Sequence, residues 1–166
     1  MRHTTKHTSA ADARADSDKA RLLKLAALIV AATFVLVGIA GFIPGLTTDA
    51  DELHFAGPHE GEGHPELLGL FHVSVLHNIV HLGFGLVGLA MARSVRGASS
   101  FLIGGAIVYA LVFVYGLVVD QDSDANFLPV NDADNVLHAA LAAGMLLLGL
   151  LLTPRRDAAD AGRGQA

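Results

Sequence analysis

The stretch LLGLFHVSVLHNIVHLGFGLVGLAMARS, residues 67–94, has the composition of a membrane span and yet contains three histidines. From 67 to 92 it has no Asp, Glu, Lys or Arg, and its polar side chains include Asn78. An α-helix rises about 1.5 Å per residue, so about 20 mainly apolar residues cross the ~30 Å hydrocarbon core of a bilayer. We therefore predict a transmembrane helix over 67–92 that carries imidazoles into the apolar part of the membrane.

Three further apolar blocks follow the same pattern, and hydrophobic residues make up 52% of the chain. The blocks lie at 25–43, 101–119 and 136–152, and apart from two tyrosines their only ionisable side chain is His138. The sequence thus predicts an all-α fold, an integral membrane four-helix bundle with spans at about 22–43, 67–92, 101–119 and 134–152. Polar tails at 1–21, expected to be mobile, and at 154–166 flank this transmembrane domain, 22–153.

Several classes of function are disfavoured by what the sequence lacks. There is no cysteine, which excludes disulfides and thiolate metal sites. No basic stripe with interleaved aromatic residues is present, so a nucleic-acid partner is not expected. No nucleophile–base pair or phosphate-binding loop can be recognised, and the sequence favours a non-enzymatic structural or interaction protein over an enzyme.

The charged residues predict the orientation in the membrane. The 11 Lys and Arg residues lie in the N-terminal part, in 93–100 and in the C-terminal tail, whereas 44–66 and 120–135 contain only acidic charges. Because basic residues remain on the cytoplasmic side, both termini are expected in the cytoplasm and the two acidic connections outside. Beyond the lipid bilayer, the partners left open are a second copy of the chain or another membrane protein.

An internal repeat relates two of the predicted helices. VLHNIVHLGFGLVGL at 75–89 and VLHAALAAGMLLLGL at 136–150 align without a gap, with Val-Leu-His, a glycine and Gly-Leu in common. Two helix–loop–helix units of this kind would be parallel hairpins related by an axis along the membrane normal. His77 and His138 would then face each other near the outer edge of the hydrocarbon.

The simpler interpretation of the histidines is structural. A buried neutral imidazole hydrogen-bonds to polar groups on neighbouring helices, each such bond contributing about 0.6–2 kcal/mol. Ser74, Asn78 and Asn135 are the expected members of such a polar network. Asp132 with Asn135 fits the start of the fourth helix as a capping pair.

The alternative is a metal site. His77 and His81 are at i and i+4 on one helix face, whereas His72 falls nearly opposite His81. With His138 they would give Zn²⁺ or copper three imidazoles, and Asp134 would be the fourth ligand or would orient one of them. Haem between His77 and His138 is disfavoured, because the acidic outer side has no Lys or Arg for the propionates. A proton path or pH sensor is the third alternative, since histidine titrates near pH 6.5.

Three motifs resemble a known family. GFIPG (41–45), LFHVSVLHNIVHLGFGLVGLA (70–90) and NDADNVLH (131–138) are similar to the bacterial, mostly actinobacterial, membrane family catalogued as domain of unknown function 4383. The resemblance covers about 22–152 and implies a bacterial plasma-membrane protein with four helices. It implies no activity. The motif positions that carry over are Phe71, His77, Asn78, His81, Asp134, Asn135 and His138.

Overall fold

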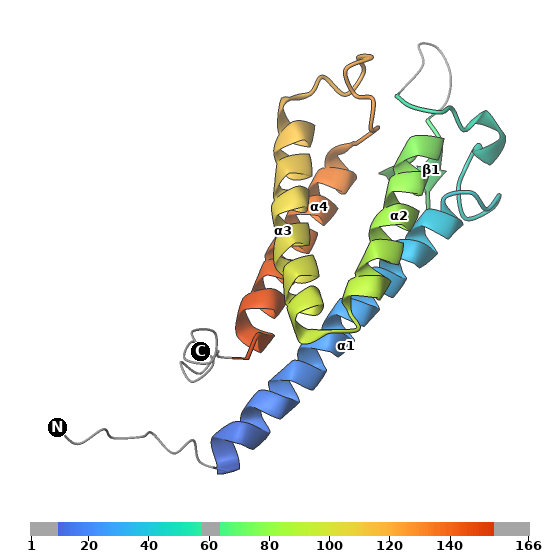
Figure 1. The fold of residues 1–166 in the computed structure, drawn as a ribbon. Helices are drawn as coiled ribbons and strands as arrows, with labels where there is room; N and C mark the ends of the chain where they lie inside the picture. The colour runs from blue at the N-terminus through green and yellow to red at the C-terminus, as the bar shows by residue number, and fades with distance from the viewer. Residues whose placement is uncertain (1–9, 58–63, 155–166) are drawn as a thin grey trace, which may run out of the picture.

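The structure is a computed structural model that describes residues 10–57 and 64–154. This part of the chain contains four α-helices, which confirms the predicted all-α bundle (Figure 1). They are α1 (Ala10–Ala40), α2 (Val75–Met91), α3 (Val95–Val118) and α4 (Asp132–Leu152). The connection from α1 to α2 adds a short 3₁₀ helix, η1 (Ala50–Glu52), and two antiparallel two-residue strands, β1 (Glu66–Leu67) and β2 (Phe71–His72).

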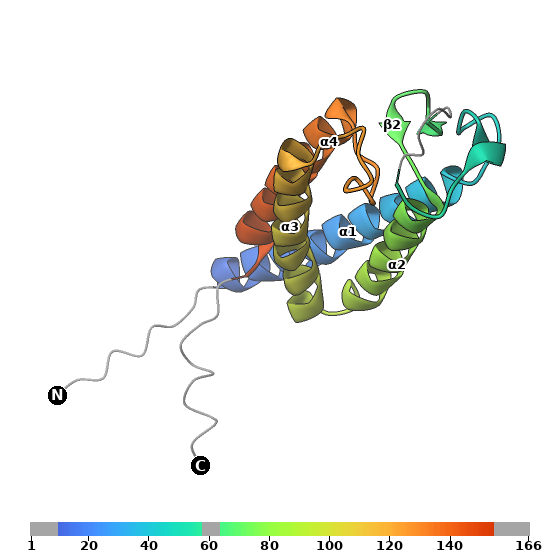
Figure 2. The same ribbon diagram turned by 90° about the horizontal axis from the view of Figure 1, so that it is seen from above.

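The helices pack as two hairpins, α1 against α2 and α3 against α4. Figure 1 shows the α2–α3 turn at the same end as the start of α1 and the end of α4, with the two long connections at the other end. Seen from above, α3 and α4 lie side by side, and α1 runs obliquely from beside the end of α4 toward α2 (Figure 2). The packing as two hairpins is the arrangement expected from the internal repeat.

Side-chain caps fix where three of these helices begin. Ser74 accepts a hydrogen bond from the backbone N–H of His77 at 3.1 Å, and Ser94 does the same for Gly97 at 3.0 Å. At α4, Asn131 and Asp134 form a capping box, in which each side chain accepts from the backbone N–H of the other residue. The predicted Asp132–Asn135 capping pair is therefore wrong, because the cap lies one residue earlier.

Three helix starts differ from the sequence expectation, and α3, expected from 101, already begins at Val95. The helix expected from 67 begins only at Val75, because Leu68 and Gly69 have positive φ angles of 57° and 65° that turn the chain into the β1–β2 hairpin. Near the N-terminus, α1 already begins at Ala10, inside the segment expected to be a mobile tail. Five of residues 10–21 are alanine, the residue with the highest helix propensity, so the segment forms a helix although its polarity had predicted a mobile tail.

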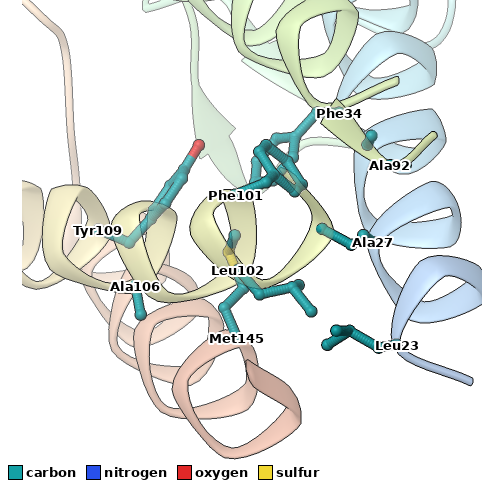
Figure 3. Close-up of a cluster of buried hydrophobic side chains, with 11 residues drawn as sticks. Leu23, Ala27, Phe34, Ala92, Phe101, Leu102, Ala106, Tyr109 and Met145 are labelled. Atoms are coloured by element: carbon teal, nitrogen blue, oxygen red, sulfur yellow. The ribbon is translucent and has the colours of Figure 1, made fainter. Parts of the chain in front are cut away.

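Small side chains let the helices approach closely around an apolar core (Figure 3). A Cβ atom on Gly85 would lie 2.8 Å from the backbone oxygen of Ala31, so α1 and α2 could not pack this way with a larger residue there. The buried core side chains come from all four helices or their ends: Leu23, Ala27, Ala31, Phe34, Ala92, Ala98, Phe101, Leu102, Ala106, Tyr109 and Met145.

The outer surface of the bundle is also apolar. Large hydrophobic side chains such as Leu36, Leu111 and Leu151 are each 66% exposed. By length and composition α1, α3 and α4 could each cross a membrane, while α2 is apolar but shorter, at 17 residues. Extensive exposed apolar surface of this kind is typical of a protein that faces lipid.

Candidate functional site

Three buried imidazoles come together in the half of the bundle that carries the long connections. His77 and His81 lie one turn apart on α2, and their Nε2 atoms are 2.8 Å from each other. His138 on α4 is 97% buried, and its ring centroid is 6.5 Å from that of His77. Tyr109 of α3 completes the group, with its hydroxyl 3.4 Å from His81 Nδ1. We call His77, His81, His138 and Tyr109 the histidine cluster.

The hydrogen bonds assign a tautomer to each imidazole of the pair. His77 Nδ1 lies 3.2 Å from the carbonyl oxygen of Pro129, which only accepts, so this nitrogen carries the proton. In a neutral ring Nε2 of His77 is then an acceptor, and His81 Nε2 donates to it. His81 Nδ1 is left as an acceptor for the hydroxyl of Tyr109. The result is one directed chain, from Tyr109 through His81 and His77 to Pro129.

Aromatic rings enclose this chain. Phe34 of α1 stacks on His81 at 5.5 Å between centroids and on Tyr109 at 5.2 Å. His138 lies 5.4 Å from Tyr109, and its buried Nδ1 has no hydrogen-bond partner among the residues that the structure describes. An unsatisfied buried polar atom costs about 1–3 kcal/mol, so His138 stabilises the fold less than a fully hydrogen-bonded imidazole would.

Two small cavities border the imidazoles. One of about 60 Å³ is lined by the whole histidine cluster together with apolar side chains such as Val108 and Leu128. The other, of about 100 Å³, is lined by the three imidazoles, by Asp134 and by residues of the β1–β2 hairpin. Either volume suits a few waters or one ion, whereas cofactor pockets measure about 300–1,000 Å³. The residues present therefore do not fit a haem.

The predicted metal ligands lie near one another without converging. Within 10–57 and 64–154, no group of three or more His, Asp or Glu side chains is arranged to hold a metal ion. With Zn–N bonds of about 2.0–2.1 Å, two ligands of a tetrahedral zinc lie about 3.3–3.4 Å apart, so 2.8 Å between the Nε2 atoms is a hydrogen-bond distance. Asp134 Oδ2 instead accepts from the backbone N–H groups of His72 at 3.0 Å and Asn131 at 3.1 Å. The geometry does not support a metal site.

The expected polar network of Ser74, Asn78 and Asn135 is not assembled either. Ser74 is a helix cap, and Asn135 Nδ2 donates to the carbonyl oxygen of Gly116 at 2.9 Å. The amide of Asn78 packs directly over Gly41 and finds no hydrogen-bond partner among the described residues. Each hairpin thus has one asparagine packed on a glycine at the C-terminal end of its first helix, at positions that would not accept a Cβ atom.

His72 lies apart from the histidine cluster, as expected. It belongs to β2, its Nε2 is 3.4 Å from Glu66 Oε1, and its ring stacks on His64 at 4.9 Å. Burial, and secondarily the neighbouring His64, lower the pKa of His72 below its ordinary value.

Tyr109 and Pro129 are the members of the site that sequence reasoning missed. Tyr109 is one of two tyrosines in an apolar block, and a buried phenol hydroxyl usually needs a partner, which was the available signal. Pro129 contributes only a backbone carbonyl, which no side-chain pattern reveals.

A comparison with known protein families bears out the resemblance. The model of the family described as domain of unknown function (DUF4383) matches residues 24–151. The chain belongs to this family. No curated protein and no solved structure matches it. The DUF4383 description assigns no activity, so the function has to be argued from the site.

Proposed function

We propose that this DUF4383 protein is a non-enzymatic integral protein of a bacterial plasma membrane, in which the histidine cluster joins two transmembrane hairpins. All four helices would cross the bilayer with both termini in the cytoplasm. The apolar outer surface and the absence of Lys and Arg from 44–66 and 120–135 support this placement. Its partners would be lipid and either a second copy or another membrane protein, a structural or interaction role.

The short helix α2 is compatible with a span. Its 17 residues measure about 26 Å, slightly less than the hydrocarbon thickness. The β1–β2 hairpin precedes it, and backbone hydrogen bonds join this hairpin to Leu46 and Thr48. Non-helical backbone near the membrane surface is tolerated when its polar groups are paired in this way.

The observation that carries the proposal is that hydrogen bonds connect the two hairpins at this end of the bundle. His77 of α2 donates to Pro129 in the α3–α4 connection, and Tyr109 of α3 bonds to His81 of α2. Two further hydrogen bonds also join the hairpins. Asn131 Nδ2 donates to the carbonyl oxygen of Leu70, and the backbone N–H of His72 donates to Asp134 Oδ2. Because lipid gives helices no hydrophobic reason to associate, such bonds hold the hairpins in register.

The membrane placement is tested with reporter fusions. Reporters at Gly57 and Ser123 should indicate the outside, and a reporter at Gly97 the cytoplasm. A cytoplasmic signal from Gly57 would overturn the orientation and with it the outer position of the histidine cluster.

The joining role is tested by a double-mutant cycle of Tyr109→Phe and His81→Leu, measured as the free energy of unfolding in detergent. We expect a coupling of about 0.6–2 kcal/mol. Tyr115→Phe is the matched control, because the Tyr115 hydroxyl donates to Ala125 within its own hairpin. It should show no coupling to His81→Leu, and equal coupling in both cycles would refute the proposal.

A second candidate function is transition-metal binding or a response to protons. It is supported by the grouping of three buried imidazoles, His77, His81 and His138, and by the unpartnered Nδ1 of His138. Zinc or copper would be held by His77, His81 and His138 only after these side chains rearranged, because no three of the described side chains are arranged to hold a metal ion.

A further inference from the structure

A second polar feature lies at the end of the bundle opposite the histidine cluster. There a groove of about 300 Å³ runs between α1 and the α2–α3 turn. Its lining combines two cations with apolar side chains: Lys24, Leu25, Leu28, Leu89, Ala92 and Arg93. Neither the family description nor the proposed function assigns a role to it.

The two cations of this groove have no anionic partner in the fold. Among residues 10–57 and 64–154, no ion pair joins Lys24 or Arg93 to a carboxylate. Arg93 is exposed and Lys24 is half-buried, so both ammonium and guanidinium groups can reach a ligand. The chain therefore presents two positive charges at one groove, one from α1 and one from the α2–α3 turn.

The apolar part of the groove adds a second requirement on the ligand. Leu25 is 48% and Leu28 46% exposed, and both lie within two turns of Lys24 on α1. A soluble anion such as free phosphate would leave these leucines uncovered. An amphiphile with a charged head and a hydrocarbon tail would satisfy the cations and cover the leucines together.

We propose that this groove binds an anionic phospholipid, with the headgroup phosphate between Lys24 and Arg93 and an acyl chain along the leucines. Basic pockets between transmembrane helices on the cytoplasmic side characteristically bind such headgroups. The inference rests on the membrane placement proposed above, which puts Lys24 and Arg93 at the inner leaflet. It adds a lipid class and a defined site to that placement.

The test is native mass spectrometry of the full-length protein in detergent, with dioleoyl phosphatidylglycerol or dioleoyl phosphatidylcholine added at equal concentration. Wild type should retain phosphatidylglycerol in preference. Lys24→Gln and Arg93→Gln should each weaken its apparent affinity about fivefold, equivalent to about 1 kcal/mol per basic residue. Arg96→Gln is the matched control, since Arg96 follows in the same region without lining the groove, and it should bind as wild type does.

Equal retention of the two lipids by wild type would overturn the proposal, because the groove would then not select an anionic headgroup. Loss of phosphatidylglycerol in Arg96→Gln as large as in Arg93→Gln would overturn it too, because binding would then follow net charge. A fusion at Gly57 that reported the cytoplasm would refute the orientation alone, since binding in detergent does not depend on it. The two proposals can therefore fail separately.

Discussion

The Nε2 atoms of His77 and His81 lie 2.8 Å apart, and the single proton between them sets the direction of every hydrogen bond in the cluster. His77 must donate from Nδ1 to Pro129, so His81 must donate to His77 and accept from Tyr109. The same proton excludes a metal ion from the space between the two nitrogens. Tyr109, His81 and His77 thus form a neutral, directed chain of hydrogen bonds between two helical hairpins, and His138 packs beside this chain.

Substitutions at His81 should separate hydrogen bonding from packing. His81→Gln keeps a donor and an acceptor, and we expect it to lower the free energy of unfolding by about 1 kcal/mol. His81→Leu leaves both Nε2 of His77 and the Tyr109 hydroxyl without a partner, which should cost about 1–3 kcal/mol more. Chemical unfolding in detergent measures both values. A leucine variant at least as stable as the glutamine variant would contradict the hydrogen-bonded chain.

The asparagine–glycine contacts predict opposite effects for alanine at different glycines. Gly41→Ala should destabilise the protein by about 1–3 kcal/mol, because the new methyl group overlaps the amide of Asn78. Gly83→Ala is the control, since a Cβ atom there meets nothing within 4 Å, and it should be neutral or stabilising by up to about 1 kcal/mol. The melting temperatures of the two variants measure these effects. Equal changes in melting temperature relative to wild type would refute the proposed asparagine–glycine packing.

Metal content distinguishes the two candidate functions. We expect the purified protein to contain less than one equivalent of zinc or copper. The metal content of the His77→Gln variant should be the same as that of wild type. Elemental analysis after dialysis against micromolar metal makes the measurement, with His72→Gln as a control outside the cluster. The metal function would be established instead if wild type and His72→Gln each contained one equivalent of metal and His77→Gln contained none. The metal should then also be released as the pH falls.

The β1–β2 hairpin should become less stable in mild acid. Burial and His64 lower the pKa of His72 below its ordinary value of 6.5, against opposing contributions from Glu66 and Asp122. The folded state therefore favours neutral His72, and the stability that it contributes is present above pH 6.5 and decreases as the pH falls below that value. The free energy of unfolding, measured between pH 7.5 and 5, should decrease toward low pH, because the unfolded chain takes up about one more proton than the folded chain does. In His72→Gln the pH dependence should be smaller, and an unchanged slope would show that another group is responsible.

The sequence predicted the helices well and the contacts between them poorly, for physical reasons that particular residues illustrate. Apolar blocks of membrane length locate the helices, because hydrophobicity is a local property of the sequence. The internal repeat predicted that His77 and His138 lie close together, because equivalent positions of the two repeats are related by symmetry. The start of α1 at Ala10 was missed because polarity and helix propensity disagree in that segment. The positive φ at Leu68 was missed because no glycine or proline occupies that position.

The partners of the site residues were harder to predict than their positions. Spacing along α2 places His77 and His81 on one face, but it cannot show that Pro129 supplies the carbonyl that orients them. Asp134 was assigned to the imidazoles because it is at i−4 from His138. Its carboxylate instead caps the helix on which it lies and accepts from His72 of another segment. Such choices depend on which backbone groups the tertiary fold leaves unpaired.

The tautomers of His77 and His81 provide the most direct test of the central claim, that a neutral, directed chain of hydrogen bonds joins the hairpins. The measurement is ¹⁵N NMR of the histidine-labelled protein at neutral pH, with His77→Gln and His81→Gln used to assign the signals. The account predicts opposite tautomers, with the proton on Nδ1 of His77 and on Nε2 of His81, and a scalar coupling between the two Nε2 atoms. The same tautomer in both rings, a doubly protonated ring, or the signature of a bound metal would contradict it.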